Sequence, residues 1–141
     1  MDVRLREAAL DDREQLGRLL ADYLFEFDGR TEPYPYLDAY WQEPERLPFL
    51  IEADGEVVGL CLVRVRDDAW DIAEFTVVPE RRRGGAGRAA VEALVELARA
   101  AGATHLVAKI HPDNRRALPF WLAAEFREMA GPDPIVTRRE L

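Results

Sequence analysis

A stretch of eight residues, ERRRGGAG at positions 80–87, combines three consecutive arginines with three glycines. It lies between a strand-like segment at 74–78 and an alanine-rich segment with helical spacing. Glycine admits a ligand close to the main chain, and the first turn of a helix offers unpaired N–H groups and a positive dipole end. Phosphate groups bind well there, and arginines add forked donors. The stretch predicts a phosphate site; a tight turn with a solvated rim of arginines is the alternative.

Two familiar phosphate-binding patterns do not fit this stretch. Arg88 follows the last glycine, so the GxxxxGK[ST] pattern of a Walker loop is absent. The GxGxxG pattern of dinucleotide-binding folds is absent too. A phosphate site here would therefore belong to another class of fold.

The bulk composition limits the classes of protein. A length of 141 residues suits one domain, and 48% hydrophobic with 33% charged residues is typical of a folded globular chain. The net charge of -8 disfavours nucleic acid as a partner and would tolerate a cationic small substrate. The sequence has neither an apolar run of about 18 residues nor a secretion signal, and its single cysteine, Cys61, cannot form an internal disulfide. We expect a cytoplasmic protein that does not bind membranes.

Hydrophobic spacing predicts alternating helices and strands around the glycine-rich stretch. The first helix should bury a stripe that includes Tyr23 and Phe27, with Glu26 facing away. The order is a strand at 3–8, a helix to about 27, a long loop at 28–48 with one helical turn near 36–42, three strands within 49–78, a helix at 86–101, a strand at 104–110, a helix to about 124 and two short strands. This order predicts an α/β fold with helices on both faces of a mixed sheet.

Two motifs resemble those of one known superfamily. VVPERRRGGAGRAAVEAL is similar to the acyl-coenzyme A signature of the GNAT N-acetyltransferases, a strand ending V-x-P followed by R/Q-x-x-G-x-G/A. NRRALPFWLAAEF is similar to a second motif, N-x-x-A-x-x-F-Y-x-x-x-G-F. The matching positions are Val77, Pro79, Arg82, Gly85 and Gly87 in the first motif, and Asn114, Ala117, Phe120 and Phe126 in the second.

The resemblance implies a fold and a cofactor. It implies one domain over residues 1–141, with a sheet of about six to seven strands whose fourth and fifth strands splay apart to admit the thioester of acetyl-CoA. Backbone N–H groups of the glycine loop would bind the pyrophosphate, and the strand end would pair with the pantetheine arm. The implied cofactor-binding residues are Val77, Val78, Arg82, Arg83, Gly84, Gly85, Ala86, Gly87, Arg88, Asn114 and Phe120.

The resemblance also assigns the chemistry. Glu74 is the first candidate for the base that deprotonates an amine, and Asp71 is the second. Ideal alternation places the two on opposite faces of a strand, although a bulge, usual in this strand of the family, would change that count. Oxygen stabilisation is expected from a backbone N–H near Val77 or Val78. The family's frequent tyrosine acid is Trp121 here, and an indole does not supply a proton near neutral pH. Tyr34, Tyr36 and Tyr40 are the alternative acids, or the thiolate leaves unaided.

The long loop is the predicted substrate wall. Its acids and aromatic rings could hold a cationic amine, and the alternative is that the rings pack on the sheet while the acids face water. The residues concerned are Asp28, Glu32, Tyr34, Tyr36 and Tyr40. The two histidines, at the ends of one strand, have no spacing typical of a metal site, so no metal is expected.

These observations favour an acyl-CoA-dependent N-acyltransferase that moves acetyl from acetyl-CoA to a primary amine of a small molecule, by direct attack in a ternary complex. Two alternatives stay open: a non-catalytic acyl-CoA-binding or sensor domain, suggested by Trp121, and a protein-modifying acetyltransferase. The family includes monomers and dimers, so the resemblance leaves open a homodimer.

Overall fold

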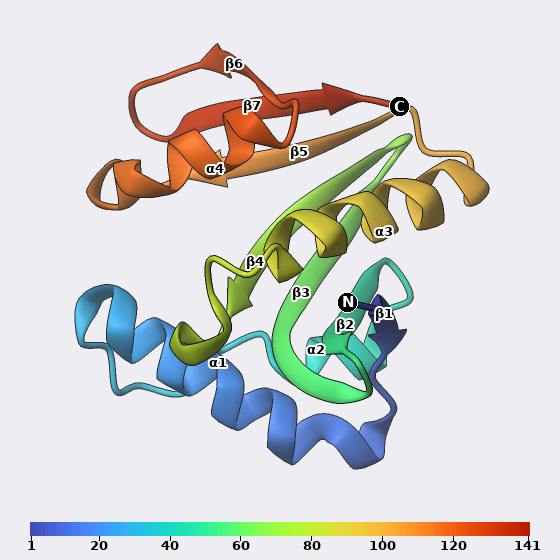
Figure 1. The fold of residues 1–141 in the computed structure, drawn as a ribbon, viewed down its shortest axis with the longest axis vertical. Coiled ribbons are helices and arrows are strands. Elements are labelled where there is room, and N and C mark those ends of the chain that lie inside the picture. The colour runs from blue at the N-terminus through green and yellow to red at the C-terminus, as the bar shows by residue number, and fades with distance from the viewer.

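The computed structural model describes all residues from Met1 to Leu141 and contains one seven-stranded sheet (Figure 1). Strand order across the sheet is β1-β2-β3-β4-β5-β7-β6, and only β4 and β5 pair in parallel. The elements are β1 (Val3–Glu7), η1 (Leu10–Asp12), α1 (Arg13–Asp28), α2 (Ala39–Gln42), β2 (Arg46–Ala53), β3 (Glu56–Arg66), β4 (Ala69–Val77), η2 (Pro79–Arg81), α3 (Ala86–Ala100), β5 (His105–Ile110), η3 (Pro112–Ala117), α4 (Leu118–Ala123), β6 (Arg127–Ala130) and β7 (Ile135–Glu140).

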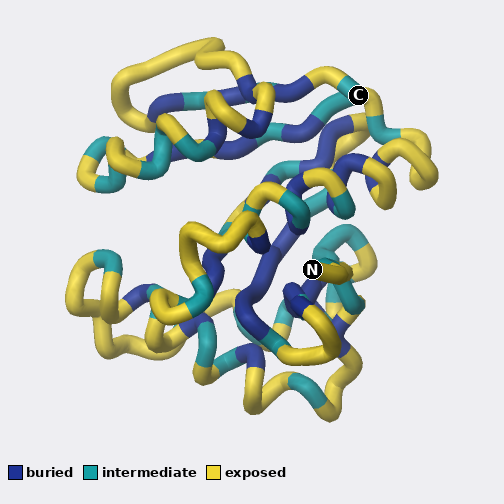
Figure 2. Tube along the Cα trace, in the orientation of Figure 1, coloured by how far each residue is buried: buried dark blue, intermediate teal, exposed yellow.

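Alternation along the long central strands places helices on both faces of the sheet. Cys61 and Val63 of β3 pack in one core cluster with α3 and α4, whereas Leu60 and Leu62 pack in another with α1 and α2. Figure 2 shows the buried residues concentrated along the central strands and the inner faces of the helices. The predicted α/β fold with two covered faces is confirmed, and Cys61 is a buried side chain as expected.

Helix α3 forms because its small and apolar residues recur every three or four positions. Ala90, Val91, Leu94, Val95 and Ala98 are fully buried against the sheet. The helix ends just before Gly102, whose φ of 87° only glycine adopts without strain. At its other end, Gly85 is the N-cap with a φ of 90°, so the chain turns sharply from the arginines into the helix.

Strands β4 and β5 are paired over only part of their length. Their register runs from Ala69 opposite His105 to Ile72 opposite Ala108, and β4 continues to Val77 without β5 as a partner. Figure 1 shows the two strands together at the right of the view and far apart at the left. The predicted splay of the fourth and fifth strands is thus present, and α1 and α4 flank its open end.

No helix combines the length and the hydropathy that a membrane crossing requires.

Candidate active site

The loop that precedes α3 leaves backbone donors without partners. Arg82 N–H donates to the Pro79 carbonyl and Ala89 N–H donates to the Gly85 carbonyl. Between them, the N–H groups of residues 85–88 have no acceptor in the protein, and no side chain caps the helix. Left-handed φ values of 65° at Arg83 and 90° at Gly85 bend the loop around this end of the helix. Such an array of free amides at a helix N-terminus is suited to an anion.

The side chain of Arg82 holds the loop in place. Its guanidinium binds both carboxylate oxygens of Glu26 on α1, at 2.7 and 2.6 Å. Its Nε donates to the carbonyl of Val77, at 2.7 Å. One side chain therefore connects α1, the end of β4 and the glycine loop. Glu26 lies outside the buried stripe of α1, as expected, and this bidentate pair joins it to the loop.

The end of β4 offers one backbone N–H to the gap. Val78 N–H donates to the carbonyl of Val58 on β3, at 2.8 Å. Hydrogen bonds alternate along an antiparallel pair, so the N–H of Val77 points away from β3 and toward the gap. The structure therefore corrects the expectation that Val78 binds the cofactor. Its N–H is already used within the sheet, and the residue does not line the cavity. Val77 lines it.

A bulge in β4 decides where the two candidate bases lie. Leu62 of β3 is opposite Glu74 and Val63 is opposite Ile72, so Ala73 is an extra residue without a partner. The extra residue turns Asp71 and Glu74 to the same face of the sheet, the α1 face, contrary to ideal alternation. Asp71 forms an ion pair with Arg66 at 2.9 Å and does not line the cavity, whereas Glu74 does.

Glu74 is a largely buried carboxyl among aromatic groups. Burial raises its pKa to about 7, and the Tyr34 hydroxyl and the charge of Arg30 lower it only in part. The Tyr34 hydroxyl donates to its Oε2 at 3.5 Å, which is a weak contact. Burial and the nearby Glu74 charge raise the pKa of Tyr23 to about 12, and the same two causes raise the pKa of Tyr34. A carboxyl with this pKa can accept a proton from an amine near neutral pH.

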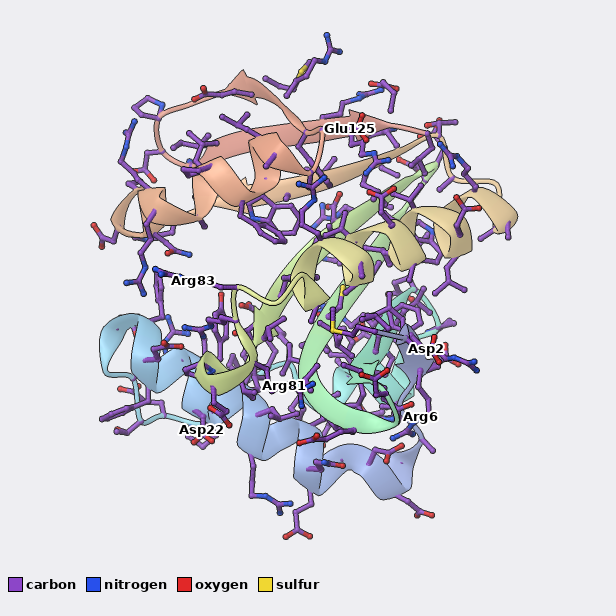
Figure 3. The ribbon with its side chains drawn as sticks, in the orientation of Figure 1. Asp2, Arg6, Asp22, Arg81, Arg83 and Glu125 are labelled. Atoms are coloured by element: carbon purple, nitrogen blue, oxygen red, sulfur yellow. The ribbon has the colours of Figure 1, made fainter.

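A cavity of about 650 Å³ joins these groups. It runs from the glycine loop along the open half of β4 to the end of β5 and the start of α4. Its charged lining consists of five cations, Arg82, Arg83, Arg88, Lys109 and Arg116, and two carboxylates, Glu26 and Glu74. Only Arg82 among the cations is in an ion pair, and Arg83 lies at the outer corner of the loop (Figure 3). In a chain with a net charge of -8, this cavity is nonetheless positive and favours an anionic ligand.

Aromatic residues form the wall near α4. Trp121 is buried and packs edge-on against Phe75 and Phe120, with ring centroids 5.3 and 5.0 Å apart. Phe120 also lies close to Gly87, where an added Cβ would come within 3.1 Å of its ring. Asn114 lines the same wall from η3. The predicted residues Gly87, Asn114, Phe120 and Trp121 thus all line the cavity, whereas Gly84 and Ala86 do not.

Most of the predicted substrate wall lies elsewhere. Asp28 pairs with Arg30 at 3.1 Å, and Glu32 is exposed. Tyr36 lies under the guanidinium of Arg46, 5.2 Å from its ring centroid. Tyr40 is buried in the core between α1 and the sheet. Of the five predicted residues only Tyr34 reaches a reactive group. Tyr40 packs in the core, Tyr36 is exposed beside Arg46, and the two acids pair with an arginine or face water.

Sequence reasoning missed three α1 residues, Tyr23, Glu26 and Phe27, which line the cavity. The sequence pattern assigns Tyr23 and Phe27 to the buried stripe of the helix. Their position near its C-terminal end could have indicated a different role, because Leu24 is the last buried residue of the helix. Phe27 reaches across to His111, with ring centroids 5.8 Å apart.

Comparisons with known proteins agree with this architecture. A model of the "Acetyltransferase (GNAT) family" matches residues 13–126, which is most of the chain. A search of curated proteins found no match.

Several solved structures share the fold over nearly their whole length. The PaiA N-acetyltransferase of Thermoplasma acidophilum, in complex with coenzyme A, has a TM-score of 0.79 at 11% identity, with 100% of both chains covered. An acetyltransferase from Thermus thermophilus has a TM-score of 0.80 at 22% identity, with 100% of this chain and 98% of the other covered. The aminoglycoside acetyltransferase AAC(6')-Ib, in complex with coenzyme A, has a TM-score of 0.81 at 21% identity, with 99% and 95% covered. With the match of the family model over most of its length, the chain belongs to the GNAT family of acetyltransferases.

Proposed function

We propose that this protein is an acyl-CoA-dependent N-acyltransferase that transfers acetyl from acetyl-CoA to a primary amine of a small molecule, by direct attack in a ternary complex. The observation that carries the proposal is the set of unpaired amides of residues 85–88, of which Gly85, Gly87 and Arg88 line the cavity at the gap between β4 and β5. Anion-binding donors and an extended slot for a linear arm are what a nucleotide thioester requires. The one carboxyl with a pKa near 7 that lines the cavity stands beside this slot.

The donors suit the successive parts of the cofactor. The free amides of residues 85–88 would bind the pyrophosphate, and the unpaired cations Arg83 and Arg88 would add charge for its phosphates. The N–H of Val77 would meet a carbonyl of the acyl-pantetheine arm. Its carbonyl is already taken by Arg82, so Val77 serves as a donor only. Asn114 and Phe120 would line the other side of the arm.

Glu74 would act as the base. An ammonium acceptor would lose a proton to its carboxylate, and the neutral nitrogen would attack the thioester carbon. The oxygen of that group would gain charge as the C–N bond forms, and the Val77 N–H would stabilise it. Asp71 is a poor alternative, because its carboxylate is engaged by Arg66 and lies outside the cavity.

The proton for the leaving thiolate would come from the acid that the first step creates. Trp121 cannot supply one, and the phenols of Tyr23 and Tyr34 are weaker acids than free tyrosine because their pKa values are raised. Protonated Glu74, with a pKa of about 7, is the strongest acid among them. Glu74 would thus accept a proton from the amine and return one to sulfur.

The acceptor would be small and would bind on the α1 side of the gap, against Tyr23, Phe27 and Tyr34. AAC(6')-Ib has been crystallised with ribostamycin and coenzyme A, which supports the idea that this fold can accept a small molecule beside the cofactor. The overall negative charge makes nucleic acid an unfavourable partner. We also propose a cytoplasmic location.

Calorimetric titration of coenzyme A, followed by thiol release from acetyl-CoA with a panel of primary amines, tests the proposal. We expect heat on binding and amine-dependent release. Glu74→Gln should keep the heat and lower release by about a hundredfold. Binding without release for any amine or basic peptide would instead favour the sensor alternative, which Trp121 suggests. Release with peptides alone would favour a protein substrate. Absence of heat with folded protein would refute the proposal.

A further inference from the structure

Lys109 is the only lysine of the chain, so it and the N-terminus are its only primary amines. It lies on β5 between Ala108 and Ile110, which are buried in the core cluster that contains α3 and α4. Because side chains alternate along a strand, Lys109 projects from the opposite face, which is the α1 face. It lines the cavity and forms no ion pair.

Lys109 and Glu74 occupy corresponding places at the point where the gap begins. The last pair of β4 and β5 is Ile72 with Ala108. The next residue on β5 is Lys109, and the next residues on β4 are the bulged Ala73 and then Glu74. The bulge turns Glu74 to the α1 face, so the base and the lysine flank the apex of the gap on the same side of the sheet. No ion pair holds the long, flexible arm of Lys109 elsewhere.

We propose that Lys109 is itself an acetyl acceptor, modified by the acetyl-CoA bound to its own chain. The inference rests on the proposed function, because it uses the same cavity and the same base. Its basis is the juxtaposition of an unpaired amine and a buried carboxyl where the thioester arm would end.

The step is balanced by groups already present. The Lys109 ammonium gives one proton to the Glu74 carboxylate, and its neutral Nζ attacks the thioester carbonyl carbon. A C–N bond forms and the C–S bond breaks. Of the two protons that the nitrogen loses, one passes by way of Glu74 to the thiolate and the other is released to water. The products are Nζ-acetyl-lysine and the free thiol of coenzyme A, with no other reactant required.

Acetylation would change the charge of the cavity. Lys109 is one of its five lining cations, and acetylation removes that charge. The modified protein would attract an anionic ligand less strongly. The reaction would therefore reduce cofactor affinity when acetyl-CoA is abundant and no acceptor competes for the thioester.

Intact-mass measurement of the full chain after incubation with acetyl-CoA, without added amine, is the direct test. We expect a gain of one acetyl group, mapped to the peptide between Arg99 and Arg115 by cleavage after arginine. Trypsin should no longer cut after Lys109 in the modified chain. Lys109→Arg should abolish the gain in this peptide, and Glu74→Gln should slow it about a hundredfold.

A relocated lysine separates enzymatic from chemical acetylation. Arg18 lies on the outer face of α1, where its side chain is 66% exposed, so the double variant Lys109→Arg/Arg18→Lys keeps one lysine and the same net charge. Its lysine should be modified at least about tenfold more slowly than Lys109. Dilution of the wild-type protein at saturating acetyl-CoA should leave the rate per chain unchanged, since the reaction is within one chain.

The outcomes separate this inference from the function on which it rests. If coenzyme A binds and external amines are acetylated while Lys109 stays unmodified, the inference is overturned and the function stands. Equal rates for Lys109 and the relocated lysine would also overturn it. If folded protein gives no heat with coenzyme A, the proposed function fails first and the inference with it.

Discussion

Replacement of Glu74 by glutamine should make the protein more stable and less active. The side chain is mostly buried, and burial raises its pKa from 4.5 to about 7. A glutamine has nearly the same shape, can still accept the Tyr34 hydroxyl, and carries no charge. The substitution therefore removes the free-energy cost of burying a carboxylate. It also removes the catalytic base, whose raised pKa has the same cause.

The size of the stability gain, and the pH range in which it appears, follow from the pKa shift of Glu74. Between pH 4.5 and about 7 the folded state keeps a proton on Glu74 that the unfolded chain has released. The free energy of unfolding of the wild type therefore falls as pH rises through this range and levels off above it. A shift of this size corresponds to at most about 3 kcal/mol, less whatever water reaches the carboxyl. Glutamine does not titrate, so the variant should gain up to about 3 kcal/mol relative to wild type near pH ~8.5 and almost nothing near pH ~4.

Urea unfolding at a series of pH values, with thiol release measured on the same samples, checks both effects. Wild-type turnover should rise with pH through about 7, as a base requires. Glu96→Gln is the control: that side chain is 74% exposed on α3, so its replacement should change stability by less than about 0.5 kcal/mol. A stability difference between Glu74→Gln and wild type that is the same at both ends of this pH series would refute the reasoning, because the buried charge would then not be its cause.

Four further substitutions, in three experiments, test how the fold supports the site. Gly59→Ala should lower the free energy of unfolding by about 3 kcal/mol in denaturant titrations, because its Cβ would collide with the Thr76 carbonyl oxygen and push β3 from β4; a neutral result would show that the strands can separate freely. Arg82→Gln and Glu26→Gln should each weaken coenzyme A binding about tenfold by calorimetry, and a double-mutant cycle should give a coupling energy of about 1–2 kcal/mol; additive effects would mean that the pair does not position the loop. Glu125→Gly should raise the melting temperature, since Glu125 has a φ of 69° and relief of that strain is worth about 1 kcal/mol; a lower melting temperature would mean that its exposed ion pair with Arg139 outweighs the strain.

Local chemistry in the sequence was enough to predict the glycine-rich turn and the helix that follows it. Gly85 must adopt a positive φ where the chain turns into α3, and the buried stripe of that helix recurs with a period that the sequence displays directly. Such features depend on residues within a few positions of one another. They survive in the tertiary structure because no distant contact has to create them.

Tertiary structure alone decided which side chains share the cavity. An extra residue at Ala73 reverses the face of Glu74 relative to simple alternation, and a bulge depends on the register between strands. Arg82 was an expected cofactor contact, but its side chain is bound to Glu26, 56 positions earlier in the chain. The acids of the long loop were expected to attract a cation, yet most of the charged residues that line the cavity are cations. The sequence by itself determined the local backbone, because helix and turn propensities act over a few residues. Strand register, the ion pair of Arg82 with Glu26 and the positive charge of the cavity depend on groups far apart in the chain, and only folding brings these groups together.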